Sequence, residues 1–206
     1  MAIWAVTGGI ACGKSAVITA FENLGVTCYS ADKDAREAMH DPEVNHAVRM
    51  AFPDAVDQSG QLDRAKLGQL IYADPTRRTQ LGTIMHPFIR TRMSQRIEQN
   101  HASDVTSLEL YEVPLLFEGR LESWFDGSIC VACNLDEQKR RLCERHHARY
   151  NTVLTNEEVS QILASQLPVT EKAALADFVI DNSGSPNDLV NLVQKLFETL
   201  MQKAGE

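Results

Sequence analysis

The chain has 206 residues and a formal net charge of −8, and hydrophobic residues make up 44% of it. This length suits one compact domain, or one domain with an insertion, and the apolar fraction is enough for a buried core. The acidic balance argues against broad nucleic-acid binding, which needs a basic surface. No run of about 18 apolar residues is present, so we expect no membrane-spanning segment.

The N-terminus carries no basic stretch before its apolar residues, which favours a strand over a signal peptide and predicts a cytoplasmic location. The five cysteines are Cys12, Cys28, Cys130, Cys133 and Cys143. They form neither a disulfide framework nor a zinc-binding pattern. Cys130 and Cys133 fall in a predicted strand, where residues three apart face opposite sides, so we expect buried structural thiols.

The first motif follows a predicted strand at residues 2–7. Residues 8–15 read G-x-x-x-x-G-K-S, and a helix is predicted from residue 14 to 24. A strand, a glycine loop and a helix in this order form a phosphate-binding P-loop. The first N–H groups of the helix have no internal partners and point at the anion.

Within the loop, Gly8 and Gly13 let the backbone fold around a phosphate. Lys14 would reach the β- and γ-phosphates, and the Ser15 hydroxyl would bind Mg²⁺. The residues predicted to bind ATP are Gly8, Gly9, Ala11, Cys12, Gly13, Lys14, Ser15 and Ala16. A thiol at Cys12 has either a pKa lowered by the unpaired N–H groups or no role beyond its small size.

A short strand is predicted at residues 26–29, followed by Ser30, Ala31 and Asp32. These residues lie at the carboxyl end of the strand, and ligands of open α/β sheets bind at the carboxyl ends of the strands. A carboxylate there could accept a proton from an attacking hydroxyl or hold a Mg²⁺-bound water. Asp32 could equally be the N-cap of the helix that begins near residue 33. The spacing leaves both interpretations open.

From residue 32 to about 100 the pattern is mostly helical, with helices predicted at 33–40, 43–51, 63–72 and 75–99. Asp41-Pro42 and Asp74-Pro75 are typical of an N-cap and a first-turn proline. This is too much helix for one crossover, so we predict a helical subdomain inserted at 32–103. Pro87 should break or kink the last helix. His86 would contact substrate or only satisfy the freed backbone.

Further strands are predicted at 108–113, 127–133 and 178–180, and further helices at 136–149, 156–164, 169–176 and 186–203. This alternation predicts an α/β fold in which a five-stranded parallel sheet lies between two helical layers. The core would comprise residues 1–31, 104–135 and 177–206. Residues 136–176 would form a helical lid.

The helix predicted at 136–149 is rich in arginine. Arg141, Arg145 and Arg149 recur every four residues, so they share one face, where like charges repel and favour an anion. A solvated charged helix is the alternative. Together with the P-loop, the pattern predicts a lid whose arginines close over the transferring phosphoryl group. Glu112, at the end of a strand, is a candidate Mg²⁺ ligand or only a surface group.

Several segments in sequence order resemble the dephospho-coenzyme A kinases, and the resemblance covers nearly the whole chain. They are residues 7–15 (T-G-G-I-A-C-G-K-S), 31–36, 62–64, 85–87 (M-H-P), 113–118 (V-P-L-L-F-E) and 179–184 (V-I-D-N-S-G). The resemblance implies a P-loop kinase core, a helical coenzyme A subdomain and a lid. It also implies phosphorylation by ATP, with Mg²⁺, of the ribose 3′-hydroxyl of dephospho-coenzyme A, the last step of coenzyme A synthesis.

The resemblance also implies catalytic and acceptor-binding residues. Asp32 matches the presumed base of the family, and Arg141 matches one of its lid arginines. With Lys14 of the P-loop, these are the residues predicted to be catalytic. Arg36 and His86 fall in segments associated with the acceptor. Binding of the acceptor would therefore involve Asp32, Arg36 and His86.

Other positions match the ATP site or depart from the family. Arg145 matches a lid arginine, and Asn182 lies in a turn expected near adenine. Ser30 stands where the family has the first Asp of D-A-D, which leaves Asp32 as the one carboxylate of that pair. Ala11 and Cys12 replace Gly and Ser in the loop. The arginine helix continues past Arg145, which predicts a longer lid.

Two rival functions come from different classes. Another P-loop kinase would phosphorylate a nucleoside monophosphate or a small metabolite, and a nucleotide-dependent switch would hydrolyse ATP slowly without an acceptor. The sequence 57–60 matches the D-x-x-G of GTPases, but no apolar strand precedes it and no N-K-x-D follows. We therefore expect ATP and dephospho-coenzyme A as partners, and neither nucleic acid nor membrane. The oligomeric state stays open.

Overall fold

The computed structural model describes residues 2–101 and 108–204. Its strands are β1 (Ala2–Gly8), β2 (Thr27–Ser30), β3 (Leu108–Glu112), β4 (Gly127–Ala132) and β5 (Phe178–Asp181). The helices are α1 (Lys14–Asn23), α2 (Ala31–Ala38), α3 (Pro42–Ala51), α4 (Arg64–Ala73), α5 (Pro75–His101), α6 (Leu135–Tyr150), α7 (Asn156–Ala164), α8 (Val169–Leu175) and α9 (Pro186–Ala204). The predicted end of the insertion at residue 103 lies outside the described residues.

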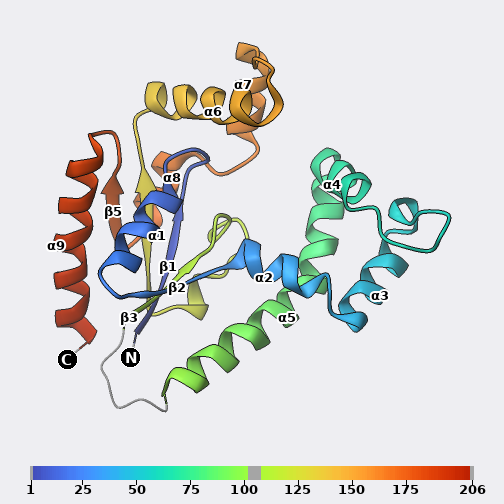
Figure 1. Ribbon diagram of the computed structural model, residues 1–206, viewed down its shortest axis with the longest axis horizontal. Coiled ribbons are helices and arrows are strands. Elements are labelled where there is room, and N and C mark those ends of the chain that lie inside the picture. Colours follow the sequence, from blue (N-terminus) through green and yellow to red (C-terminus); the bar gives the residue numbers. More distant parts are fainter. Residues whose placement is uncertain (1, 102–107, 205–206) are drawn as a thin grey trace. The chain divides into compact units, whose positions relative to one another are not determined.

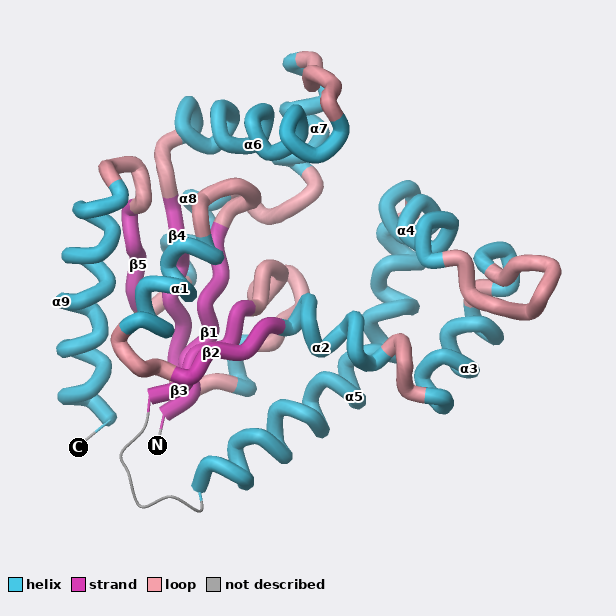
Figure 2. Tube along the Cα trace, in the orientation of Figure 1, coloured by secondary structure: helices cyan, strands magenta, loops and turns pink. Residues whose placement is uncertain are grey.

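The five strands form one parallel sheet in the order β2-β3-β1-β4-β5 (Figure 2). The central strand β1 is buried along most of its length, and Val6 pairs with Glu112 on one side and Ile129 on the other. Strands buried on both faces read as continuous apolar runs, as β1 and β4 do. This arrangement confirms the predicted sheet.

Helices cover both faces of the sheet. The connection from β1 to β2 through α1 crosses the sheet in one direction, and that from β4 to β5 through α8 crosses in the other (Figure 1). Because such crossovers are right-handed, α1 and α8 lie on opposite faces. α9 packs beside α1. The predicted three-layer α/β/α fold is confirmed, with a core that includes Val17, Phe21 and Leu200.

The chain divides into two compact units, Met1–Ser30 with Val105–Glu206 and Ala31–Asp104. The second unit has its own core, which includes Val48, Phe52 and Met85. The Asp41 carboxylate accepts hydrogen bonds from the backbone N–H groups of Glu43 and Val44 and so caps α3. The helices of the second unit, α2 to α5, begin and end within two residues of the predicted bounds.

Helix α5 runs through Pro87 without a break. Proline has no N–H to donate to the carbonyl one turn earlier, so a bend is expected there. The ribbon of α5 changes direction partway along its length (Figure 1). Of the two predicted outcomes, the proline therefore kinks this helix and does not end it. In the described part of the chain, no helix is both long and apolar enough to cross a membrane.

Candidate active site

The loop between β1 and α1 requires glycine at two positions. Gly8 has φ +146°, and a Cβ there would overlap the carbonyl oxygen of Val131 on β4. Gly13 has φ +90°, and a Cβ there would overlap the Asn182 side chain. Ala11 also lies in the left-handed region, at φ 60°, without the freedom of glycine. The backbone thus forms the tight turn that a P-loop needs.

Lys14 lies inside this turn. Its Nζ donates to the carbonyl oxygens of Gly8, at 3.1 Å, and Gly9, at 3.0 Å. Burial lowers the pKa of Lys14, and the nearby Lys172 lowers it further. Glu112 and Arg145 also act on that pKa, in opposite directions, so their charges lie within reach of Lys14. The charges of Lys172, Glu112 and Arg145 therefore all act on the loop lysine.

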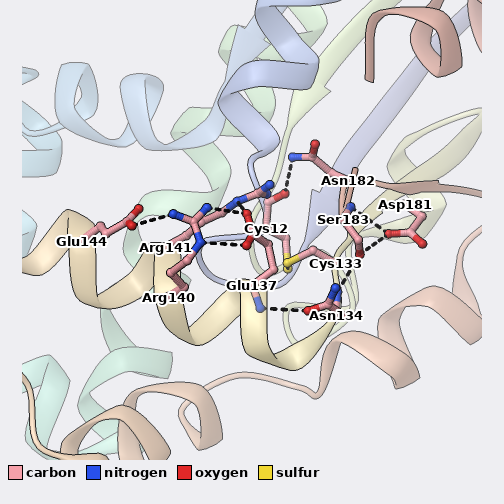
Figure 3. Close-up of polar contacts among 10 residues, drawn as sticks. All are labelled: Cys12, Cys133, Asn134, Glu137, Arg140, Arg141, Glu144, Asp181, Asn182 and Ser183. Atoms are coloured by element: carbon pink, nitrogen blue, oxygen red, sulfur yellow. Dashed lines mark hydrogen bonds and ion pairs between the residues drawn. The ribbon is translucent and has the colours of Figure 1, made fainter. Parts of the chain in front are cut away.

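Two buried side chains donate hydrogen bonds to carbonyl oxygens of the loop. Asn182, buried at the end of β5, donates from Nδ2 to the Cys12 carbonyl oxygen at 2.9 Å (Figure 3). Gln138, buried on α6, donates from Nε2 to the Ile10 carbonyl oxygen at 2.9 Å. The amide nitrogen of Asn182 is therefore bonded to the loop. Sequence reasoning missed Gln138, because the pattern of α6 gives no sign that it faces the loop.

Cys12 is fully buried, and its Sγ lies 3.2 Å from the Cys133 Sγ. Burial raises the pKa of Cys12, although the neighbouring Lys14 acts against the shift. The hypothesis of a lowered pKa is therefore wrong, since desolvation outweighs the loop charges. Cys130 and Cys133 are free and buried, as predicted.

Helix α6 carries the arginines, and acidic residues hold two of them. The Glu137 carboxylate accepts from Arg141 Nε at 2.6 Å and from both Nε and Nη2 of Arg140. Arg140 also pairs with Glu144 (Figure 3). The hydrogen bonds from Arg140 are the largest cause that lowers the pKa of Glu137 to about 2. Glu137 precedes the two arginines by three and four residues, so the sequence did contain this signal.

The arginine stripe divides along the helix. Arg141 Nη1 lies 3.5 Å from the place that a Cβ on Gly13 would take, so this guanidinium is at the P-loop. Arg145 acts on the pKa of Lys14. Arg149 instead lies over the Tyr150 ring, 5.2 Å from its centroid. Arg141 therefore lies at the loop, and Arg145 acts on the loop lysine electrostatically. The anion that offsets the Arg141 charge in this structure is the Glu137 carboxylate.

Lys172 on α8 is a further charged group that sequence reasoning missed. Its side chain is fully buried, and its Nζ lies 2.8 Å from both the Pro114 carbonyl oxygen and Glu118 Oε1. Nothing in the sequence of α8 distinguishes a buried lysine from an exposed one.

Asp32, Arg36 and His86 belong to the second unit. Asp32 is the second residue of α2, exposed, and its carboxylate makes no hydrogen bond within the described part of the chain. Asp32 therefore does not cap the helix, and the alternative interpretation of Asp32 as an N-cap is excluded. Arg36 Nε donates to the Asp32 carbonyl oxygen at 3.1 Å. His86 is half-buried in α5, and burial lowers its pKa.

The family model for dephospho-CoA kinase (CoaE) matches residues 2–188. The chain belongs to the dephospho-CoA kinase family. A dephospho-CoA kinase from Enterococcus faecalis is 36% identical over 200 residues and covers 96% of each chain. Another, from Anaeromyxobacter dehalogenans, is 35% identical and covers 100% of this chain and 95% of its own.

Solved structures share the fold of this chain. The crystal structure of TT1252 from Thermus thermophilus has a TM-score of 0.79 and 31% identity over 97% of each chain. Dephospho-CoA kinase from Campylobacter jejuni shares the fold, with a TM-score of 0.68 and 24% identity over 98% of each chain. Membership of the dephospho-CoA kinase family makes the protein a kinase, and its structure contains the P-loop.

Metal binding in this dephospho-CoA kinase family member would need few protein ligands. Among the described residues, no group of three His, Cys, Asp or Glu side chains could hold a metal ion. Mg²⁺ commonly takes one or two protein oxygens and otherwise phosphates and water. The exposed Ser15 hydroxyl on the first turn of α1 and the Glu112 carboxylate near Lys14 suit that mode.

Proposed function

We propose that the protein transfers the γ-phosphoryl group of Mg·ATP to the ribose 3′-hydroxyl of dephospho-coenzyme A. The observation that carries the proposal is the group of charges at the P-loop, with Lys14 inside the turn and Arg141 beside Gly13. Membership of the dephospho-CoA kinase family identifies the acceptor. The expected location is the cytoplasm, where ATP is available.

The donor site is formed by the loop and α6. Backbone N–H groups of the loop and of the first turn of α1 would bind the phosphates, because the first N–H groups of a helix lack partners one turn earlier. The N–H groups of Cys12 and Ala16 already donate to the carbonyl oxygens of Gly9 and Gly13. Lys14, Arg141 and Arg145 would stabilise the charge that spreads over the transferring group. Ser15 and Glu112 would hold Mg²⁺, which neutralises phosphate charge when bound. Asn182 would support this site through its bond to Cys12.

The acceptor site is proposed in the second unit. Asp32 would orient or deprotonate the 3′-hydroxyl, and its exposed carboxylate has no competing hydrogen bond within the described residues. Arg36 and His86 would bind the acceptor. Since Ser30 replaces the other family carboxylate, the proton transfer would depend on Asp32 alone.

The direct test is mass spectrometry of dephospho-coenzyme A incubated with the purified protein and Mg·ATP, with the 3′ position assigned by NMR. We expect one added phosphoryl group on the acceptor and an equal amount of ADP. A panel of nucleoside monophosphates and small metabolites separates this function from that of another kinase. Binding of ATP without acceptor phosphorylation would refute the proposal, and ATP hydrolysis that ignores the acceptor would favour a switch.

A further inference from the structure

Lys172 has an unusual environment for a lysine. Its side chain is 0% exposed, whereas its ion-pair partner Glu118 is 24% exposed. A buried ammonium group is costly unless it is paired and hydrogen-bonded. The Lys172 Nζ meets both conditions, with Glu118 Oε1 and the Pro114 carbonyl oxygen at 2.8 Å each. Such a group needs an explanation beyond filling space, because an apolar side chain of similar volume would fill it without that cost.

The two oxygens bound by Lys172 have other partners. The Pro114 carbonyl oxygen also accepts from Thr7 Oγ1 at 3.4 Å, and Thr7 directly precedes the first glycine of the P-loop. Glu118 Oε1 also accepts from the Leu167 backbone N–H at 2.9 Å. One ammonium group thus connects the end of β1, the segment after β3 and the chain that leads from α7 to α8.

The segment that leads from α7 to α8 is where a helical arm returns to the sheet. The helical arm comprises α6 and α7, residues 135–164, and lies between β4 and α8 in the chain (Figure 1). Where it leaves β4, the Asn134 N–H donates to Ser183 Oγ at 2.8 Å (Figure 3). Gln138 provides a second bond there, to the Ile10 carbonyl oxygen. Where it returns, at residues 165–168, Glu118 provides the corresponding bond through Leu167.

We propose that Lys172 and Glu118 are positioning residues for phosphoryl transfer. They fix the return of the helical arm, so that Arg141 and Arg145 on α6 stay at the P-loop. The inference rests on the proposed function, because it assigns those arginines to the phosphates. Lys172 itself is too deeply buried to touch a substrate. Its charge also lowers the pKa of Lys14, and the positioning effect proposed here is the separate one that it exerts through the arm.

Three variants separate positioning from a general loss of stability. Glu118→Gln keeps an oxygen for the Leu167 N–H but leaves the Lys172 charge unpaired, and Lys172→Met removes the donor. The double variant Glu118→Gln/Lys172→Met removes both charges, so its melting temperature should recover towards that of the wild type. The exposed Glu171→Gln on α8 and Lys195→Met on α9 are matched controls.

We expect kcat to fall about tenfold or more in the double variant, because small displacements of catalytic groups have large effects on rate. The affinity for ATP should stay within about threefold, since the P-loop and Lys14 remain. The two controls should keep the wild-type kcat. Recovery of kcat together with the melting temperature in the double variant would overturn the proposal, because it would show a structural role only.

Amide hydrogen exchange provides a readout that needs no acceptor. We expect faster exchange at residues 165–168 and in the helical arm of Lys172→Met and of the double variant, with no change in β1 or α1. Unchanged exchange at residues 165–168 would overturn the proposal. If wild-type protein makes no phosphorylated product, the proposed function fails, whereas the exchange data still decide whether the pair holds the arm.

Discussion

Asp32 and Glu43 occupy equivalent places in two helices of the same unit. Each is the second residue of its helix, α2 or α3, and each is exposed. We expect Asp32→Asn to lower kcat by about a hundredfold or more, the range for loss of a general base. Its affinity for ATP should not change. Steady-state kinetics with dephospho-coenzyme A and an equilibrium titration with ATP measure the two effects.

Glu43→Gln is the control for that substitution, because it removes the same charge from the same helix position. We expect its kcat to remain at the wild-type value. Near-normal turnover of Asp32→Asn would exclude Asp32 as the base. An equal loss of kcat in both variants would show that the loss comes from removing a negative charge at a helix N-terminus, and not from removing a catalytic base.

Ala11 stands in the left-handed backbone region, with φ 60°. This conformation costs a non-glycine residue roughly 1–2 kcal/mol. Glycine would remove that cost but increase the entropy of the unfolded chain, worth about 0.4–1 kcal/mol. We therefore expect Ala11→Gly to raise the free energy of unfolding by up to about 1 kcal/mol.

Urea denaturation measures this effect. The control is Ala148→Gly, at an exposed position within α6, where glycine should lower the free energy of unfolding by about 1 kcal/mol. The same chemical change should thus have opposite signs at the two sites. A clear loss of stability in Ala11→Gly would contradict the idea that the loop backbone is strained.

The cysteines should differ in their reactivity. Burial raises the pKa of Cys12, and it raises those of Cys28, Cys130 and Cys133 to about 12, 11 and 12. Because the thiolate is the reactive species, these four should react slowly with iodoacetamide at neutral pH. We expect Cys143, half-buried on α6, to be modified first. Peptide mass spectrometry over time measures this order, and early labelling of Cys12 would contradict it.

Helix α6 carries both the Glu–Arg ion pairs and the arginines proposed to bind the phosphates. Glu137 binds both Arg140 and Arg141, whereas Glu144 binds Arg140. We expect Glu137→Gln to lower kcat/KM for ATP by about tenfold, the effect of losing one interaction of about 1.4 kcal/mol. Glu144→Gln should stay near the wild-type value. Equal kinetics of the two variants would mean that the orientation of Arg141 is not set by Glu137.

The pH dependence of this network follows from the lowered pKa of Glu137, about 2 in the folded protein. A carboxyl whose pKa falls on folding contributes stability above its unfolded pKa of about 4.3. That contribution is lost as the pH falls towards about 2. We therefore expect the stability difference between wild type and Glu137→Gln to be constant from pH 6 to 8, in the range of kinetic assays, and to vanish in strong acid.

Secondary structure could be predicted well, because local signals determine it. Asp41 caps α3 as its position before Pro42 indicates, and Asp74 before Pro75 accepts from the Thr76 N–H at the start of α5. The P-loop was predictable because residues 8–15 carry the whole constraint in one stretch. Tertiary partners could not be predicted in this way. The bonds of Lys172 to Pro114 and Glu118 join residues more than fifty positions apart, and no local pattern records them.

At the scale of the whole molecule, the two units have separate hydrophobic cores. One core includes Phe21 and Ile129, and the other includes Phe52 and Met85. The proposed ATP site draws on the first unit, whereas Asp32, Arg36 and His86 belong to the second. Each substrate alone should therefore stabilise mainly the unit that binds it.

Amide hydrogen exchange with one substrate at a time tests this division. At a concentration one hundred times its dissociation constant, a ligand stabilises the state that binds it by about 2.7 kcal/mol. With Mg·ATP alone, we expect slower exchange in β1, the loop, α1 and α6. With dephospho-coenzyme A alone, we expect slower exchange in α2 and α5. Slower exchange in α2 and α5 with Mg·ATP alone, without slower exchange in α1, would contradict the proposed assignment of the substrates. ATP bound at the loop should slow exchange first in the loop and in α1, which contact its phosphates.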